Sequence, residues 1–302
     1  MYITVQATDT PGRIDAFLAK KLPNLSRSFI QKQIKIGSIL VNNQPVSAHH
    51  RLRTNDVVSV SKTEKDEPAV VPDNTIALRI VDEQEGYVVI EKPAGLIMHP
   101  APGITEPTLA DALAARYPEI SGVGDDALRP GIVHRLDRNV SGLLVAARTQ
   151  ELFEHLKKQF KNRSMHKEYL ALVHGVVDED GVIATPIGRS KTKSGKMATR
   201  PHAQQGDREA LTEYRILEHY ANYTLLAVTI KTGRSHQIRV HLNSIGHPVV
   251  GDTLYTNRRI KPSVLGRLFL HASKLEFDDI NGVRKSYESP LPEELNAFLA
   301  SL

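Results

Sequence analysis

The first sixty residues show the apolar pattern of two short helices followed by short strands. Apolar side chains recur every three or four positions over residues 13–22 and again over residues 27–36, which predicts two amphipathic helices. Ser26 is suited to cap the second helix, and Gly37 to end it. The strands that we expect to follow cover residues 39–41, 45–46 and 57–60.

Beyond this segment, helical and extended patterns are mixed without regular alternation. Residues 63–75 are polar, charged and rich in proline, so we place a linker there between a domain at 1–62 and a domain at 76–302. Helices are expected to begin at Thr108 and Thr149. Strands are expected at 76–81, 87–90, 142–147, 169–174 and 223–230. Because strands and helices do not alternate, an α+β fold with a mixed sheet is favoured over a doubly wound fold.

Residues 232–247 read TGRSHQIRVHLNSIGH and allow two interpretations. A helix capped by Ser235 is favoured, because the apolar residues then share one face and Gln237 and His241 share another. A strand in which Gln237, Arg239 and His241 alternate outward is the weaker alternative.

The composition of the chain disfavours membrane proteins and disulfide-rich secreted proteins. With 302 residues, of which 40% are hydrophobic, the chain can form two globular domains. No apolar run approaches the roughly 18 residues of a membrane helix, and the first residues do not resemble a secretory signal. The chain has no cysteine, which excludes disulfides and thiolate metal sites. We therefore expect a cytoplasmic protein that does not associate with membranes.

Positive charge is concentrated in the first domain. Between residues 12 and 62, nine Lys and Arg residues face two Asp residues, giving +7, whereas the whole chain carries +5. This pattern is typical of nucleic-acid binding, although a solvated basic surface fits the charge equally well. Arg27, Lys32 and Lys35 lie on the polar side of the second predicted helix and are candidate RNA contacts. The segment GRIDAFLAKKLPNLSRSFIQKQIKIGSILVNNQPV resembles the S4 RNA-binding module, which implies binding to RNA phosphates.

In the second domain, one carboxylate lies between two arginines. Asp137 stands between Arg135 and Arg138, just ahead of the apolar run at 142–147. A lone carboxylate among cations suits a nucleophile or an electrostatic stabiliser. A residue that merely caps a turn is the competing interpretation, and this segment alone favours it. The chain has no His-Glu-x-x-His motif, Gly-x-Ser-x-Gly motif or nucleotide-binding fingerprint, so we expect neither a metal nor a cofactor.

Three further segments change this interpretation. HRLDRNVSGLLVAA begins at His134, KEYLALVHG begins at Lys167, and TGRSHQIRVHLNSIGHPVVGD begins at Thr232. In this order they resemble the nucleophile, tyrosine and arginine motifs of the RluA-type pseudouridine synthases. The resemblance implies a pseudouridine synthase fold with a mixed, mostly antiparallel sheet. It also implies an isomerase that requires no cofactor.

The same resemblance implies roles for individual residues. Asp137 would act on the target uridine, either by attacking C1′ of the sugar or by assisting departure of the base through a glycal. Arg239 would pair with Asp137 and hold it ionised, and Tyr169 would stack on the uracil. Arg135 would occupy the space that the extruded base leaves, with His134 beside it in substrate binding.

The arrangement of the domains bears on the substrate. An S4-like module ahead of the synthase domain is the layout of the family members that act on ribosomal RNA. Large-subunit ribosomal RNA is therefore the expected partner, and a monomer the expected state. Transfer RNA is an alternative substrate, and a non-catalytic RNA-binding or ribosome-assembly factor is an alternative function. The presence of Asp137, Tyr169 and Arg239 together argues against the non-catalytic alternative.

Overall fold

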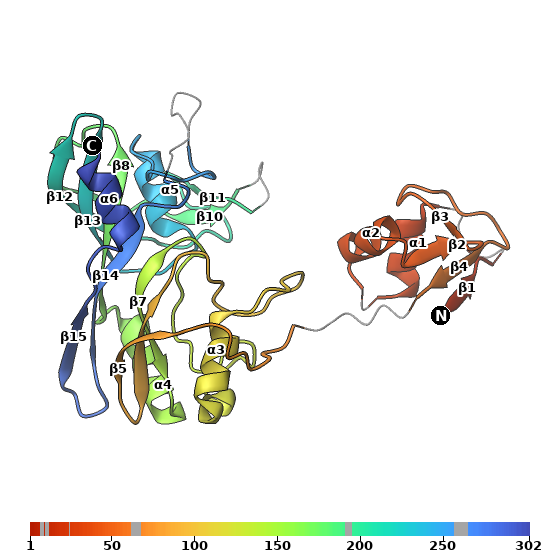
Figure 1. Cartoon of the computed structure of the whole chain (residues 1–302). Coiled ribbons are helices and arrows are strands. Elements are labelled where there is room, and N and C mark those ends of the chain that lie inside the picture. Colours follow the sequence, from red (N-terminus) through yellow and green to blue (C-terminus); the bar gives the residue numbers. More distant parts are fainter. Residues whose placement is uncertain (7–8, 10–11, 24, 62–67, 191–194, 257–264) are drawn as a thin grey trace. The chain divides into compact units, whose positions relative to one another are not determined.

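The chain forms two compact units, Met1–Glu67 and Pro68–Leu302 (Figure 1). The computed structural model describes residues 1–6, 9, 12–23, 25–61, 68–190, 195–256 and 265–302. Residues 62–67, which include the start of the predicted linker, lie outside the described residues. Each unit has its own buried apolar core, as expected for two domains.

The later part of the predicted linker belongs to the second unit. The amide of Val71 donates to Oδ1 of Asp111 at 2.8 Å, and the amide of Asp73 donates to the carbonyl oxygen of Asp111 at 3.1 Å. The predicted linker at 63–75 therefore extends too far toward the C-terminus. Its polar composition suggested free chain, but the amides of Val71 and Asp73 both bond to Asp111, which lies on a helix of the second unit.

The first unit packs two helices on a small sheet. Helices α1 (Ile14–Lys21) and α2 (Arg27–Lys35) confirm the two predicted helices, and Oγ of Ser26 accepts the amide of Phe29 at 3.3 Å as the predicted cap. The sheet has the order β1-β4-β2-β3. Its strands are β1 (Tyr2–Thr4), β2 (Ile39–Val41), β3 (Gln44–Pro45) and β4 (Val57–Val60). The three predicted strands are present, and β1 adds an edge that was not predicted.

The second unit is built on a nine-stranded sheet with the order β5-β6-β7-β14-β8-β13-β12-β9, in which β15 also pairs with β14. Among the strand pairs of the described residues, β7 and β14 are parallel and the others are antiparallel. This confirms the mixed, mostly antiparallel sheet of an α+β fold. The strands are β5 (Arg79–Glu83), β6 (Tyr87–Lys92), β7 (Ser141–Ala147), β8 (His166–His174), β9 (Gly181–Ile183), β12 (Thr212–Tyr220), β13 (Tyr223–Ile230), β14 (Leu270–Asp278) and β15 (Arg284–Glu288), with a separate pair β10 (Ile187–Arg189) and β11 (Met197–Thr199).

Helices lie against both ends of this sheet (Figure 1). They are α3 (Leu109–Arg116), the 3₁₀ turn η1 (Pro118–Gly122), α4 (Gln150–Asn162), α5 (Gln237–Ser244) and α6 (Glu293–Ala300). The predicted starts at Thr108 and Thr149 are confirmed: Asp111 accepts the amide of Thr108 at 2.7 Å, and Oγ1 of Thr149 accepts the amide of Leu152 at 3.3 Å. In the described parts of the chain, no helix combines the length and apolarity needed to cross a membrane.

Helix α5 confirms the helical interpretation of residues 232–247, but the predicted cap is wrong. The helix begins after His236, which adopts a left-handed conformation with φ of 57°. Oε1 of Gln237 accepts the amide of Arg234 at 3.0 Å, and this bond closes the turn that we assigned to Ser235. As predicted, Gln237 and His241 share a face, because both bond to Oγ1 of Thr212.

A glycine brings the only parallel pair of described strands close together. Gly142 has φ of 117° and lies opposite Ala272 in the β7–β14 ladder. A Cβ atom at this position would collide with the carbonyl oxygen of Ala272, so the close approach requires glycine. The loop of residues 133–140, which carries Asp137, leads directly into this contact and thus enters the sheet beside β14.

Candidate active site

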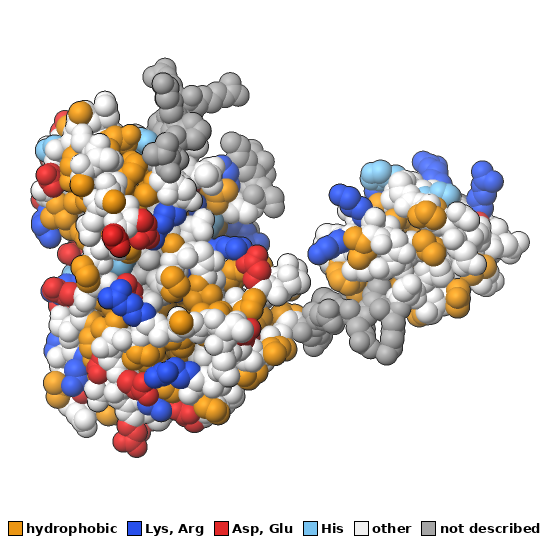
Figure 2. Space-filling model, in the orientation of Figure 1, with side chains coloured by type: hydrophobic (Ala, Val, Ile, Leu, Met, Phe, Trp, Pro, Cys, Tyr) orange, Lys and Arg blue, Asp and Glu red, His pale blue; other side chains and the backbone are white. Residues whose placement is uncertain are grey.

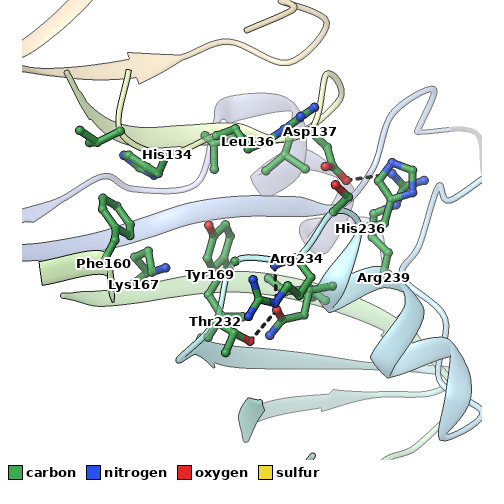
Figure 3. Close-up of a pocket in the computed structure, with 18 of the residues that line it drawn as sticks. His134, Leu136, Asp137, Phe160, Lys167, Tyr169, Thr232, Arg234, His236 and Arg239 are labelled. Atoms are coloured by element: carbon green, nitrogen blue, oxygen red, sulfur yellow. Dashed lines mark hydrogen bonds and ion pairs between the residues drawn. The ribbon is translucent and has the colours of Figure 1, made fainter. Parts of the chain in front are cut away.

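A cavity of about 400 Å³ opens beside the loop of residues 133–140, strand β8 and the start of helix α5 (Figure 3). Asp137 reaches it from the loop, Tyr169 from β8 and Arg239 from α5. The fold therefore brings together three predicted site residues that are far apart in the sequence. All three side chains line the cavity. Their contacts with neighbouring residues determine what the cavity can bind.

Arg239 joins two carboxylates. Its Nη1 donates to Oδ2 of Asp137 at 2.9 Å. Its other edge faces Asp252, with Nε 2.7 Å from Oδ2 and Nη2 2.9 Å from Oδ1. Asp252 is fully buried and also accepts the amides of Leu254 and Tyr255, at 2.8 and 2.9 Å. Arg239 is thus fixed in orientation by Asp252, and it presents one donor to Asp137.

The charge of Arg239 is secured by this arrangement. Burial acts to lower its pKa, but the hydrogen bonds and negative charges of Asp252 and Asp137 outweigh burial and raise the pKa above its usual value. The guanidinium also lies over the ring of Tyr255, with 5.2 Å between Cζ and the ring centroid. The centre therefore holds a permanent cation between two carboxylates, and Asp137 is the more accessible of the two.

Tyr169 supplies a flat, neutral wall. Its side chain is 6% exposed and lies between Lys167 and Asp137 in Figure 3. Burial, and next the charge of Asp137, raise the pKa of Tyr169 above its usual value, so the phenol keeps its proton at neutral pH. A neutral aromatic face next to a carboxylate can hold a planar base while the carboxylate acts on the atom attached to it.

His134 and Arg135 also line the cavity, in different ways. Arg135 is exposed at the opening. His134 lies in the wall: its Nε2 accepts the amide of Val145 at 3.0 Å, and its ring centroid is 5.0 Å from that of Phe160. Burial, and next the charge of Lys167, lower the pKa of His134 to about 3. The ring is therefore neutral, and it carries its proton on Nδ1.

The remaining predicted contacts, Arg27, Lys32 and Lys35, lie on α2 of the first unit. In the space-filling view, Lys and Arg side chains project from this unit (Figure 2). Lys32 and Lys35 are exposed. Arg27 and Arg13 both bond to the buried carboxylate of Asp15, at 3.1 and 2.8 Å, and keep 52% and 38% of their side chains exposed. Asp15 therefore orients two arginines at the surface, and it is not simply an opposing charge.

Sequence reasoning assigned no role to Lys92, which anchors the loop that carries Asp137. Lys92 is fully buried, and its Nζ donates to the carbonyl oxygens of Pro93, Leu96 and Arg138 at 2.7, 2.9 and 3.1 Å. Burial lowers the pKa of Lys92 to about 7. The three bonds join the chain after β6 to the residue that follows Asp137, and so they fix the position of that loop.

Two further residues, Asp252 and Lys167, were also missed although both stand inside the segments quoted above. Lys167 precedes Tyr169 by two positions, and the alternation of a strand predicts that both face the same side. No comparable local signal pairs Asp252 with Arg239. Within the described residues, no three His, Asp or Glu side chains converge as metal ligands would.

Comparisons with known proteins identify the family. Residues 86–244 match the model of RNA pseudouridylate synthases, and residues 12–58 match that of the S4 domain. The chain belongs to the RNA pseudouridylate synthase family. The synthase is therefore an isomerase that acts on RNA, which confirms the predicted class of enzyme and disfavours the non-catalytic alternative.

Relatives of the synthase resemble it along nearly its whole length. An RNA pseudouridine synthase of Chloroflexus aurantiacus is 41% identical over 99% of this chain and 93% of that protein. Ribosomal large subunit pseudouridine synthase D of Neisseria meningitidis serogroup B is 37% identical over 99% of this chain and 81% of that protein. The structure of human RNA pseudouridylate synthase domain containing 1 is 29% identical, with a TM-score of 0.57 over 73% of this chain and 86% of that one.

Proposed function

We propose that the synthase converts uridine to pseudouridine in large-subunit ribosomal RNA, with Asp137 as the residue that acts at C1′ of the target. The observation that carries this proposal is the contact of 2.9 Å between Asp137 and Arg239 at the cavity. Asp252 holds Arg239 in place, and Arg239 in turn holds the carboxylate of Asp137 in the cavity that Tyr169 also lines. This is the preorganisation that a nucleophile or electrostatic stabiliser requires.

The reaction exchanges one bond of the sugar for another. The bond between N1 of uracil and C1′ breaks, the base turns, and C5 bonds to C1′. The proton on C5 leaves and N1 gains a proton, so the product is an isomer of the substrate. Asp137 takes part either by bonding to C1′ or by assisting a glycal route, and both require its carboxylate beside the sugar. Stacking on Tyr169 would keep the detached base in the cavity.

A uridine in folded RNA must leave its stack before it can enter the cavity. Arg135 is exposed at the opening, where a planar guanidinium can stack in the vacated position and also form hydrogen bonds. We therefore propose that Arg135 stabilises the RNA from which the base has been removed. The neutral ring of His134, with Nδ1–H available as a donor, would form part of the wall around the bound nucleotide.

Relatives and domain composition favour ribosomal RNA as the substrate. Two relatives, from Neisseria meningitidis and Nitrosomonas europaea, are named ribosomal large subunit pseudouridine synthase D and are 37% and 38% identical to this chain. The S4 domain adds a basic RNA-binding surface. Every side chain of the proposed centre comes from one chain, so we propose that the monomer is active. The proposed substrate also implies that the enzyme works in the cytoplasm, where ribosomes are assembled.

The wild-type enzyme should release tritium from large-subunit ribosomal RNA that carries 5-tritiated uridine, because the C5 proton leaves when C5 bonds to C1′. Transfer RNA transcripts with the same label should release none above the rate without enzyme. The measurement is tritium in the solvent over time, with both naked ribosomal RNA and partly assembled large-subunit particles as substrates. Release from transfer RNA alone would contradict the proposed substrate.

Replacing Lys32 and Lys35 by Gln should weaken RNA binding and make it less sensitive to salt. Each lysine that contacts a phosphate releases counterions, so the slope of log K against log salt concentration should fall by about 1.5 for the pair. The measurement is an anisotropy titration of a labelled ribosomal RNA fragment at several KCl concentrations. Lys274→Gln is a matched control, because Lys274 is already paired with Glu276 and Glu288. An unchanged slope would show that α2 does not contact the phosphates.

A further inference from the structure

We propose that Lys167 is a further catalytic residue, whose ammonium stabilises the negative charge that uracil carries while it is detached from C1′. This inference rests on the uridine isomerisation proposed above. It concerns a side chain for which the pairing of Asp137 with Arg239 provides no role. The support comes from the position of Lys167, from its contacts and from the order of side chains along the cavity.

Lys167 is a buried cation that faces the cavity. Its residue is 8% exposed, and it lies on β8 two positions before Tyr169, so both side chains point to the same side of the sheet. Its Nζ lies 4.9 Å from the ring centroid of Phe160. The face of an aromatic ring attracts a cation, but it compensates only part of the hydration that burial removes.

A comparison with the other buried lysine shows what Lys167 lacks. The ammonium of Lys92 donates to three backbone carbonyl oxygens, which accounts for all of its protons. The hydrogen bonds and ion pairs found among the described residues include none made by Nζ of Lys167. The adjacent ring of His134 is neutral and uses Nε2 for a backbone amide. The donors of Lys167 therefore remain available to a molecule in the cavity.

The charge of this lysine persists at neutral pH. Burial lowers the pKa of Lys167 to about 8, which leaves most of the molecules protonated at pH 7. Keeping a cation there lowers the stability of the fold, since an apolar side chain of similar size would bury more favourably. A buried charge that lowers stability and faces a cavity is a common feature of functional sites.

The order of side chains along the cavity matches a bound nucleotide. Tyr169 lies between Lys167 and Asp137 (Figure 3). A uridine with its sugar at Asp137 and its base against Tyr169 directs the far edge of the base, which carries O4, toward Lys167. The negative side chain of Asp137 then lies at the sugar of the bound uridine, and the positive side chain of Lys167 lies at the far edge of its base.

This placement suits the charge that develops in the reaction. When the bond between N1 and C1′ breaks, its electron pair stays with the base, and uracil becomes an anion with charge shared by N1, O2 and O4. An ammonium that donates to O4 stabilises this anion more than the neutral base, which lowers the barrier. When C5 bonds to C1′, the base uses an electron pair for the new bond, C5 loses its proton and N1 gains one. Lys167 keeps its protons throughout.

The test compares Lys167→Met and Lys167→Arg with the wild type by single-turnover tritium release on the ribosomal RNA substrate. Lys167→Met should lower the rate about 100-fold, in line with the loss of one preorganised donor at a developing anion. Its dissociation constant for RNA should stay within about threefold of the wild type, because the charge acts after binding. Lys167→Arg should restore the rate to within about tenfold of the wild type, because it keeps a cation at the same position.

Thermal stability separates this role from a structural one. Lys167→Met should raise the melting temperature while it lowers the rate, since it removes a buried charge that has no carboxylate partner. Lys92→Met is the contrasting control. It removes the ammonium that joins the carbonyl oxygens of Pro93, Leu96 and Arg138, and among the described residues only that of Arg138 keeps a second donor, the amide of Gly95. It should therefore lower the melting temperature together with the rate.

Each result has one interpretation. If the wild type releases no tritium from any RNA or ribosomal particle, the proposed function fails, and the role of Lys167 fails with it. If the wild type is active and Lys167→Met retains its rate within threefold, only the inference about Lys167 is overturned. A parallel loss of rate and melting temperature in Lys167→Met would also overturn it, because Lys167 would then be structural.

Discussion

Asp137→Asn should abolish tritium release, with a single-turnover rate at least about 10⁴-fold below the wild type. The amide has the shape of the carboxylate and can still accept a hydrogen bond from Arg239. It cannot form the bond to C1′ or stabilise positive charge on the sugar. The measurement is tritium release at saturating enzyme, with RNA affinity measured in parallel. The affinity should stay within about threefold of the wild type, because phosphate contacts supply most of the binding.

A second aspartate provides the control for this substitution. Asp125 is exposed and paired with Lys157 on the surface, 2.7 Å away, so Asp125→Asn should behave like the wild type in both measurements. Retention of even a few per cent of the rate in Asp137→Asn would exclude Asp137 as an essential group. Loss of RNA binding in this variant would show that the carboxylate organises the fold of the cavity instead.

Arg239→Met should reduce both activity and stability. Asp252 would remain buried without a counter-ion, and this should lower the free energy of unfolding by about 3–5 kcal/mol. Asp137 would lose the donor that fixes it, so tritium release should fall about 10³-fold. Urea unfolding and single-turnover tritium release measure the two effects on the same protein.

A double variant separates the two effects. Adding Asp252→Asn to Arg239→Met removes the unpaired buried charge, so most of the lost stability should return. The activity should not return, because Asp137 still lacks its partner. If the double variant regained both, Arg239 would act only by preserving the fold. If it regained neither, Asp252 would have a role apart from the charge of Arg239.

The predictable parts of the fold are those that depend on local signals. Ser26 and Thr149 begin helices because each side chain accepts an amide within one turn of chain. Thr108 begins a helix because Asp111, three residues on, accepts both its amide and its hydroxyl. In the second unit, strands β9, β10, β11, β12, β14 and β15 were not predicted. Strand β12 has one buried residue, and its other residues are half-buried or exposed without clear alternation. It is held by pairing with β13 and β9. Such pairing depends on residues elsewhere in the chain, which a local pattern does not reveal.

The residues of the candidate site likewise fall into those that the sequence predicted and those that it did not. Asp137, Tyr169 and Arg239 were predicted through their motifs, whereas residue spacing alone could not pair Asp137 with an arginine 102 residues away. The bidentate partner Asp252 was missed because its importance comes only from the packing of the turn after α5. Lys167 was missed because the predicted strand began at Tyr169, whereas the strand of the structure begins at His166 and places both side chains on one side. Its burial, which makes it unusual among lysines, depends on the surrounding fold.

The ammonium of Lys167 also bears on which base the cavity accepts. Uracil and cytosine share the same edge near the sugar and differ at the far edge, where uracil carries an oxygen and cytosine an amino group. An ammonium has donors and no acceptor, so it pairs with the oxygen and faces the amino group donor to donor. The side chain proposed to stabilise the detached uracil would thus also reject cytidine, and base discrimination would need no separate recognition element.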